Sequence, residues 1–240
     1  SDLVAVLAFR ADPNRRRGVA RFVPSTAPTR LRVGVYSAIV QCQRVARLLE
    51  SALTIAPMDW SEAAEEVEGD LNGRLVFTCE HASNALHDPW RWPESDRWLV
   101  DTHWASDIGA GAFTRRVAAL TNAPAVLSRF SRLLIDPNRP LDSDTLFRQN
   151  ADGHQVHLNE GLLEADRQQR IDRFYHPYHA AVSQMVKRSR GDTVFSIHSF
   201  TDNYEGDART LEIGVLFDDD EEPAYRLIRH LESAGFHVLA

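Results

Sequence analysis

Two histidines in the sequence stand at the ends of apolar runs, where they could bind a metal ion. His81 follows the apolar run 74–79, and His198 follows the apolar run 193–197. Neutral imidazole is a common zinc ligand, and a catalytic zinc ion usually takes three protein ligands and one water molecule. A single histidine of this kind is more often a hydrogen-bonded core residue. It is therefore the pair that indicates a metal site.

A third metal ligand should be another histidine or a carboxylate, and several side chains qualify. Glu80 adjoins His81, and the two side chains could converge if the chain turns there. His103 and Asp107 stand four residues apart and could share one face of a helix. Asp101 is a further option, and Asp107 could equally cap a helix. The sequence does not rank these candidates.

Three arginines close together in the chain indicate a site that binds a carboxylate. Arg129, Arg132 and Arg139 follow an apolar run, and Asn138 adds an amide group beside Arg139. A guanidinium group can bind a carboxylate through two parallel hydrogen bonds. The competing explanation is an ordinary salt bridge to a neighbouring carboxylate such as Asp136.

Other catalytic chemistries find less support in the sequence. Ser83, Ser196 and Ser199 lie near the histidines, but no Gly-x-Ser-x-Gly nucleophile motif occurs. Gly109 and Gly111 have no predicted strand ahead of them and do not complete a phosphate-binding glycine loop. Metal-assisted hydrolysis is therefore the leading hypothesis.

Alternating strands and helices must position these residues. The sequence predicts strands at 74–79, 125–127, 193–197 and 211–217, and helices at 106–120, 160–190 (with a kink near Pro177) and 221–233. This alternation is typical of an α/β fold with three layers, in which helices flank a mostly parallel or mixed sheet. Ligands bind such sheets beyond the carboxyl ends of the strands, which is where the polar motifs stand.

The composition is that of a globular protein. The chain has 240 residues, 43% of them hydrophobic and 25% charged, and its net charge is −7. Its two cysteines exclude a disulfide framework and a four-cysteine zinc site. No run approaches the roughly 18 apolar residues of a membrane helix. We expect a soluble, cytoplasmic protein, and the sequence does not indicate its oligomeric state.

The first 57 residues are basic and hard to assign to a domain. Residues 1–47 contain nine arginines and two aspartates. A nucleic-acid-binding arm and an organelle transit peptide are two alternatives, but neither aromatic residues interleaved with the arginines nor a binding motif supports a nucleic-acid partner. Because Met58 opens a segment typical of a native start, we interpret 1–57 as a non-native or disordered extension. We interpret 58–240 as one domain.

Four blocks of the sequence, in this order, resemble the N-formylglutamate amidohydrolase family. The blocks are 79–84, 103–110, 128–140 and 197–200, followed by a similar strand at 211–216. The resemblance extends over about residues 71–240. It implies a metal-dependent amidohydrolase that releases formate from a small N-acyl amino acid such as N-formylglutamate, with one zinc ion as cofactor.

The family is similar in fold to the zinc carboxypeptidases, and this likeness implies roles for individual residues. By that likeness His81 and His198 bind zinc. The carboxypeptidases have a glutamate three residues after the first histidine, where this chain has Asn84. We therefore assign Glu80 as the third metal ligand. The remaining assignments are substrate binding by Asn138, Arg139 and Ser199, and catalysis by Arg129, Arg132 and Asp107.

The resemblance also implies a catalytic glutamate on a late strand. Glu212 follows His198 by only 14 residues, so we interpret it as a structural residue. We therefore expect the domain to be C-terminally incomplete, with its general base beyond Ala240. Two alternatives stay open: a carboxypeptidase-like or other N-acyl-amino-acid hydrolase, and a catalytically incomplete fragment that binds a metal or a carboxylate.

Overall fold

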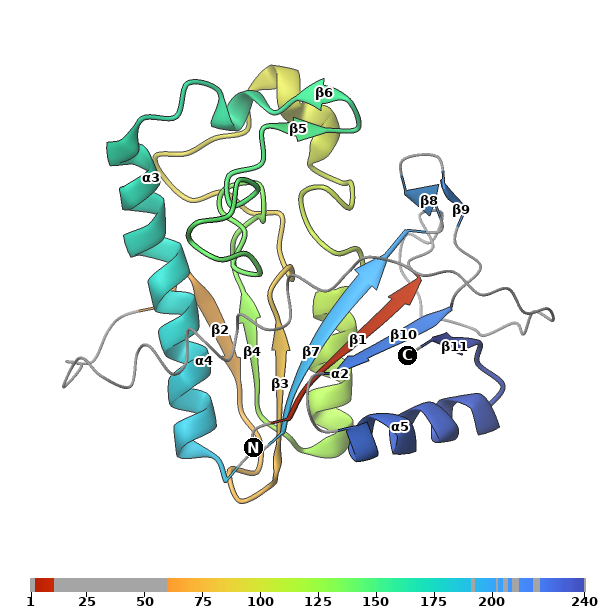
Figure 1. The fold of residues 1–240 in the computed structure, drawn as a ribbon. Coiled ribbons are helices and arrows are strands. Elements are labelled where there is room, and N and C mark those ends of the chain that lie inside the picture. Colours follow the sequence, from red (N-terminus) through yellow and green to blue (C-terminus); the bar gives the residue numbers. More distant parts are fainter. Residues whose placement is uncertain are drawn as a thin grey trace.

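A mixed seven-stranded sheet forms the centre of the fold, in the order β11-β10-β1-β7-β3-β4-β2 (Figure 1). The structure is a computed structural model that describes residues 3–10, 60–190, 193–201, 203–204, 207–208, 212–217 and 221–239. For residues 3–10, 203–204 and 207–208, only the backbone is described.

Parallel pairing dominates the middle of the sheet. Its strands are β1 (Leu3–Arg10), β2 (Ala64–Val67), β3 (Leu75–Cys79), β4 (Ala125–Ser128), β7 (Thr193–Phe200), β10 (Ile213–Phe217) and β11 (Val238–Leu239). The pairs β1–β7, β7–β3, β3–β4 and β10–β11 are parallel, whereas β1–β10 and β2–β4 are antiparallel. Two short hairpins lie outside the sheet: β5 (Asn150–Ala151) with β6 (His154–Gln155), and β8 (Asn203–Tyr204) with β9 (Asp207–Ala208).

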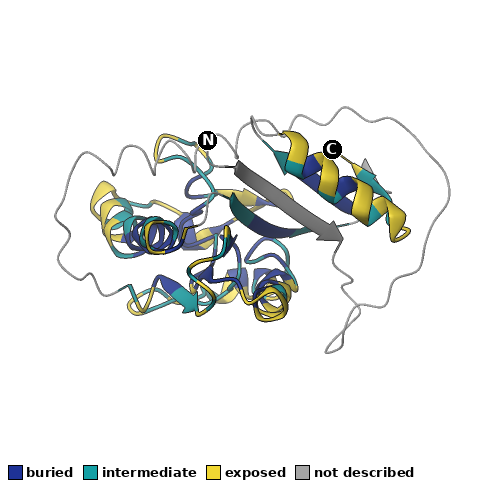
Figure 2. Cartoon of the chain, turned by 90° about the horizontal axis from the view of Figure 1, so that it is seen from below, coloured by how far each residue is buried: buried dark blue, intermediate teal, exposed yellow. Residues whose placement is uncertain are grey.

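Helices cover both faces of the sheet. They are η1 (Glu94–Leu99), α2 (Ala110–Thr121), η2 (His157–Asn159), α3 (Glu164–Arg170), the π turn η3 (Ile171–Tyr175), α4 (His176–Arg188) and α5 (Glu221–Ser233). Successive side chains of a strand point to opposite faces. Val76 therefore packs into the cluster that contains Tyr178 of α4, whereas Phe77 packs into the cluster that contains Ala118 of α2. Figure 2 shows buried residues along the sheet and exposed residues on the outer sides of the helices.

The predicted mixed α/β sheet with flanking helices is confirmed. The four predicted strands are observed, although residue 211, the first of the last one, lies outside the described residues. The predicted helix 160–190 begins at Glu164 and ends at Arg188, and its irregular part is the π turn just before Pro177. Proline has no N–H group to donate, so it fits the first turn of α4.

Strand β1 comes from the segment that the sequence left outside the domain. The apolar run Leu3–Arg10 inserts between β7 and β10, parallel to the first and antiparallel to the second. Residues 11–59 lie outside the described residues. The interpretation of 1–57 as a non-native or disordered extension, and of 58–240 as a domain cut short at its carboxyl end, stays a prediction.

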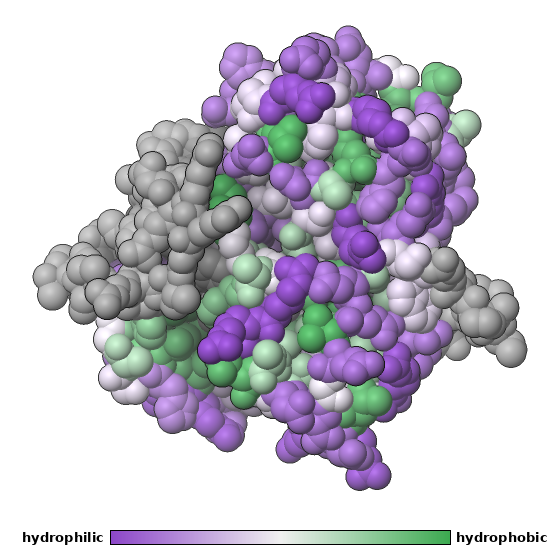
Figure 3. Space-filling view, turned by 180° about the vertical axis from the view of Figure 1, so that it is seen from behind, coloured by the Kyte–Doolittle hydropathy of each residue, from purple (hydrophilic) through white to green (hydrophobic). Residues whose placement is uncertain are grey.

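No described helix is both long enough and apolar enough to cross a bilayer. On the face seen in Figure 3, hydrophilic side chains predominate and hydrophobic ones gather mainly in the lower half.

A buried arginine on α3 ties together the loops beyond β4. Arg170 is 3% exposed, and its Nη1 donates to the Leu134 carbonyl at 3.0 Å and to Asn159 Oδ1 at 2.7 Å. Its Nη2 donates to the Leu158 carbonyl at 3.2 Å. Asn159 in turn donates to the carbonyls of Leu133 and Arg148, both at 2.9 Å. These bonds hold the segment that leads to Asp136 and Arg139.

Replacing Arg170 by methionine should lower the free energy of unfolding by about 3 kcal/mol, because buried carbonyl oxygens would lose their donors. Urea unfolding measures the change. The control is Arg97→Met on η1, where an exposed 3.5 Å pair with Glu94 contributes less than about 1 kcal/mol. Equal losses in the two variants would contradict the structural role of Arg170.

Candidate metal and active site

Adjacent strand ends and the turn before α2 bring three buried side chains together. His81 follows β3, His198 lies near the end of the neighbouring β7, and Asp107 stands just ahead of α2. The backbone N–H of Asp107 donates to the His81 carbonyl at 2.9 Å, which ties the turn to the end of β3. The backbone N–H of Ser199 donates to Asp107 Oδ2 at 3.2 Å.

His81, Asp107 and His198 form a group that could bind a metal ion. One candidate ligand atom from each lies within 4.8 Å of the other two, and the residues are 2%, 6% and 8% exposed. Asp107 Oδ1 lies 3.4 Å from His81 Nδ1, and Asp107 Oδ2 lies 2.8 Å from His198 Nδ1. His81 Nδ1 is buried and makes no hydrogen bond within the described part of the chain. Because an unpaired buried nitrogen is costly, this atom fits the role of a metal ligand.

The other nitrogen of each imidazole ring is held by a second carboxylate. His81 Nε2 lies 2.7 Å from Asp136 Oδ1, and His198 Nε2 lies 3.2 Å from Glu80 Oε2. When a neutral histidine donates a hydrogen bond from its Nε2–H group to a carboxylate, the lone pair at Nδ1 is left available to a metal. The arrangement therefore directs both Nδ1 atoms towards Asp107.

Glu80 is itself held by α4 and β7. Its carboxylate accepts hydrogen bonds from the hydroxyl of Tyr178, at 3.2 Å, and from the hydroxyl of Ser196. Burial alone would raise the pKa of Glu80, but the hydrogen bond and charge of His198, with the bond from Ser196, lower it to about 2. Glu80 is therefore ionised at neutral pH.

The surrounding charges shift the pKa values of the other groups as well. Burial alone would lower the pKa of His198, but hydrogen bonds to Asp107 and Glu80 raise it to about 10. Burial alone would raise the pKa of Asp107, yet the charge of His81 and the hydrogen bond with His198 hold it well below its usual range. Burial opposes ionisation of Asp136 too, but the charges of His81 and Arg132 lower its pKa. In the metal-free protein a protonated His198 thus compensates the buried carboxylates.

Two arginines and an asparagine border this cluster. Arg132 Nη1 lies 3.3 Å from Asp107 Oδ1, and its Nη2 lies 3.1 Å from Asp136 Oδ2. Arg139 Nε lies 3.9 Å from Asp136 Oδ2, and the backbone N–H of Asn138 donates to Asp136 Oδ1 at 2.9 Å. Arg132 and Arg139 are partly exposed. Both of them form the salt bridges that were the competing explanation in the sequence, and their exposed parts leave room for a carboxylate ligand as well.

Other sequence candidates lie away from the cluster or at its margin. Arg129 is exposed, and its charge adds to the hydrogen bond from Arg115 that lowers the pKa of Glu65 on the edge strand β2. Asp101 is exposed as well. His103 packs against Trp104 with ring centroids 4.7 Å apart. The structure therefore brings Asp107, rather than His103 or Asp101, between the two histidines.

Asp136 and Ser196 make contacts with the histidines that the sequence did not indicate. Asp136 was considered only as a salt-bridge partner, whereas it also contacts His81. Ser196 was considered as a nucleophile, whereas its hydroxyl bonds Glu80 and lies 3.0 Å from His198 Nε2. The spacing Ser196-x-His198, with both side chains on one face of a strand, was the available signal.

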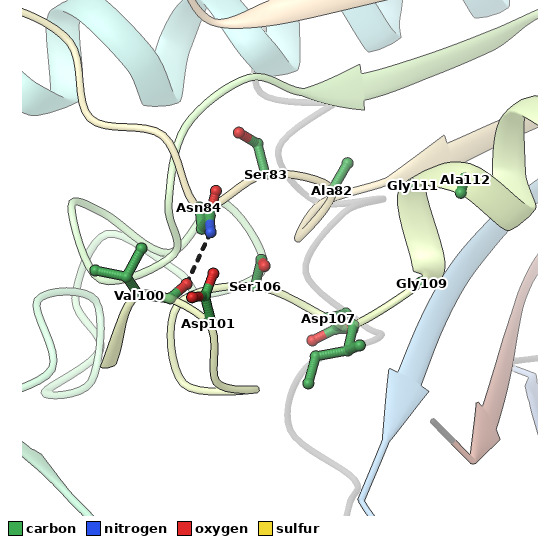
Figure 4. A pocket seen from close by; sticks show the side chains of 11 residues that line it. Ala82, Ser83, Asn84, Val100, Asp101, Ser106, Asp107, Gly109, Gly111 and Ala112 are labelled. Carbon is green, nitrogen blue, oxygen red and sulfur yellow. Dashed lines mark hydrogen bonds between the residues drawn. The ribbon is translucent and has the colours of Figure 1, made fainter. Parts of the chain in front are cut away.

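A pocket of about 370 Å³ opens beside Asp107. It lies between the loop after β3 and the first turn of α2, and Ser83, Asn84 and Ser106 are among its lining residues (Figure 4). Asn84 donates from Nδ2 to the Val100 carbonyl at 2.8 Å, which joins two sides of the pocket. Asp107 is one of its lining residues, whereas His81 and His198 are not.

Comparisons with known proteins identify relatives of this chain. The family model of N-formylglutamate amidohydrolase matches residues 73–240. A crystal structure of a gene product from Agrobacterium tumefaciens is 30% identical, with a TM-score of 0.69, over 75% of this chain and 73% of that one. A crystal structure of N-formylglutamate amidohydrolase from Ralstonia eutropha JMP134 is 21% identical, with a TM-score of 0.56, over 74% and 75% of the two chains, and shares the fold. No curated protein matches this chain.

The raised pKa of His198 predicts how the stability of the metal-free protein depends on pH. Its stabilising contribution is complete below its unfolded pKa of about 6.5 and disappears as the pH rises towards its folded pKa of about 10, a loss of up to about 5 kcal/mol. Urea unfolding with a chelator present, at pH 6, 8 and 10, measures this loss. The variant His198→Gln should have a flatter profile, and the exposed control His230→Gln should match the wild type. Equal slopes in the wild type and His198→Gln would refute the assignment.

Proposed function

The chain belongs to the N-formylglutamate amidohydrolase family, and from this premise we propose that it hydrolyses the amide bond of an N-formyl amino acid, such as N-formylglutamate. The products are formate and the free amino acid. We propose one zinc ion as cofactor and a cytoplasmic location. The observation that carries the metal is the group of two Nδ1 atoms and one carboxylate, in which His81 Nδ1 has no hydrogen bond to a described residue.

In this proposal His81, Asp107 and His198 hold the zinc ion. Asp107 replaces Glu80 as the third ligand, because the Glu80 carboxylate lies against Nε2 of His198 and not against Nδ1. Glu80 and Asp136 then hold the two imidazole rings in the orientation that presents Nδ1. A bound zinc ion supplies Lewis acidity to a carbonyl oxygen and lowers the pKa of a water molecule.

The arginines bind the substrate in this proposal. Arg139, with Asn138, binds the carboxylate of the amino acid, and Ser199, whose backbone N–H donates to Asp107, also contacts the substrate. In this proposal Arg132 stabilises the negative charge that develops on the carbonyl oxygen of the amide, and its contact with Asp107, the proposed third ligand, supports this role. The exposed Arg129, whose charge acts on Glu65, has no such contact among the described residues.

Local charge must overcome the charge of the whole chain. The net charge of −7 disfavours an anionic substrate at long range, so capture depends on Arg132 and Arg139. The buried carboxylates Glu80, Asp107 and Asp136 each contact a histidine. For that reason we assign none of them as the group that transfers the proton.

Removing one proposed ligand should remove the metal. The wild-type chain should bind one equivalent of zinc, and His81→Ala and His198→Ala should bind less than about a tenth as much, because two ligands cannot hold a catalytic zinc ion. Inductively coupled plasma mass spectrometry of dialysed protein measures the content. The exposed variant His230→Ala serves as control. An unchanged zinc content in both His81→Ala and His198→Ala would contradict the metal assignment.

Arg139 should determine the affinity of the protein for the substrate carboxylate. Arg139→Met should raise KM for N-formyl-L-glutamate about 30-fold or more with a smaller change in kcat, because a charge-assisted pair contributes about 2 kcal/mol or more. Formate release measures both constants, and Arg226→Met on α5 is the control. A panel of formyl, acetyl and peptide substrates separates the proposed reaction from the alternative hydrolases. If the zinc-loaded wild type is inactive on the whole panel, the hydrolase proposal is wrong, and the alternative of a protein that only binds a metal or a carboxylate is favoured.

A further inference from the structure

A π turn, η3, separates α3 from α4 in the helical segment that contacts the loop 134–139. In the turn η3 the backbone N–H of His176 donates to the Ile171 carbonyl, five residues earlier, where an α-helix would reach back four. Turns of this kind insert one residue into a helix, and they occur frequently at functional sites. This turn therefore changes which side chains face the sheet.

The inserted residue puts three donor side chains on one side of the helix. In a regular α-helix Arg170 and Tyr175, five residues apart, would point about 140° away from each other. The wider π turn brings Tyr175 back towards the side that Arg170 occupies. Tyr175 and His179, four residues apart, then share a face of α4. All three side chains are almost fully buried.

These three side chains donate to carbonyl groups of one short segment. Arg170 donates to Leu134 at 3.0 Å, and the hydroxyl of Tyr175 donates to Arg139 at 2.9 Å. His179 Nε2 lies 3.0 Å from the Pro137 carbonyl and must be the donor there, because a carbonyl can only accept. Burial lowers the pKa of His179 to about 4, so the ring is neutral at pH 7.

The segment held in this way carries the polar groups that border the site. Asp136 contacts His81 and Arg132, and Arg139 lies beside Asp136. The same face of α4 also presents Tyr178, whose hydroxyl donates to Glu80. Tyr178 on α4 thus contacts Glu80 directly. Tyr175 and His179 act on Asp136 through the segment 134–139, which they bond.

We infer that the π turn is a positioning device, in which Tyr175 and His179 hold the loop 136–139 so that Arg139 presents its guanidinium group to a substrate carboxylate. The contact with the carboxylate rests on the proposed function, whereas the support of the loop does not. Tyr175 and His179 are positioning residues because they act through the backbone of Pro137 and Arg139. Loss of either donor frees the loop and leaves a carbonyl without its partner.

Hydrogen exchange and steady-state kinetics on the full chain test this inference. Tyr175→Phe removes one hydroxyl group, and Tyr225→Phe, on the exposed face of α5, is the matched control. The amides of Asn138 and Arg139, which donate to Asp136, should exchange about tenfold faster in Tyr175→Phe while the rest of the chain keeps its protection. The KM for N-formyl-L-glutamate, from formate release, should rise about tenfold, and the zinc content should not change.

A second pair of variants separates positioning from packing. His179→Leu should reproduce the faster exchange, and His179→Gln, which retains an N–H donor, should restore part of the protection. Unchanged exchange at the two amides in Tyr175→Phe and His179→Leu would overturn the inference, as would a uniform loss of protection throughout the chain. If the wild type does not hydrolyse N-formyl-L-glutamate, the proposed function fails, and the exchange rates alone decide whether the loop is positioned.

Discussion

The candidate site depends on the contact of each of its two histidines with a buried carboxylate. Asp136 contacts Nε2 of His81, and Glu80 contacts Nε2 of His198. These contacts orient both rings, so that the two Nδ1 atoms face Asp107. They also offset much of the cost of burying carboxylates, because each negative charge has a cation or a donor within hydrogen-bond distance. The surrounding loops and helices keep these partners in place.

Much of the fold follows from local patterns in the sequence. Short apolar runs between helical segments predict the strands β3, β4, β7 and β10, and their ends carry the polar motifs. Strand β1 was not predicted because its place between β7 and β10 depends on pairing with residues far along the chain, and a short apolar run does not reveal its partner. The π turn was expected only as a kink near Pro177, since periodicity does not register one inserted residue.

The candidate site could be predicted in part. His81 and His198 were identified because residues at the carboxyl ends of adjacent parallel strands converge, which the sequence pattern implies. The residues alone did not rank the third ligand, and the family likeness favoured Glu80 over Asp107, because the choice depends on which ring nitrogen each carboxylate meets. That geometry arises from the turn that bonds the Asp107 amide to the His81 carbonyl, and no motif encodes it. Side chains supplied by a distant helix, such as Tyr178, were missed for the same reason.

The central claim is that both histidines present Nδ1 to the metal while Nε2 keeps its proton for a carboxylate. Nitrogen-15 NMR of histidine-labelled protein, recorded before and after one equivalent of zinc, measures this directly. We expect the Nδ1 signals of His81 and His198 to shift to metal-bound values while both Nε2 atoms stay protonated and bonded to Asp136 and Glu80. Zinc shifts at Nε2 of either ring, or no zinc-dependent shift at His81, would contradict the account.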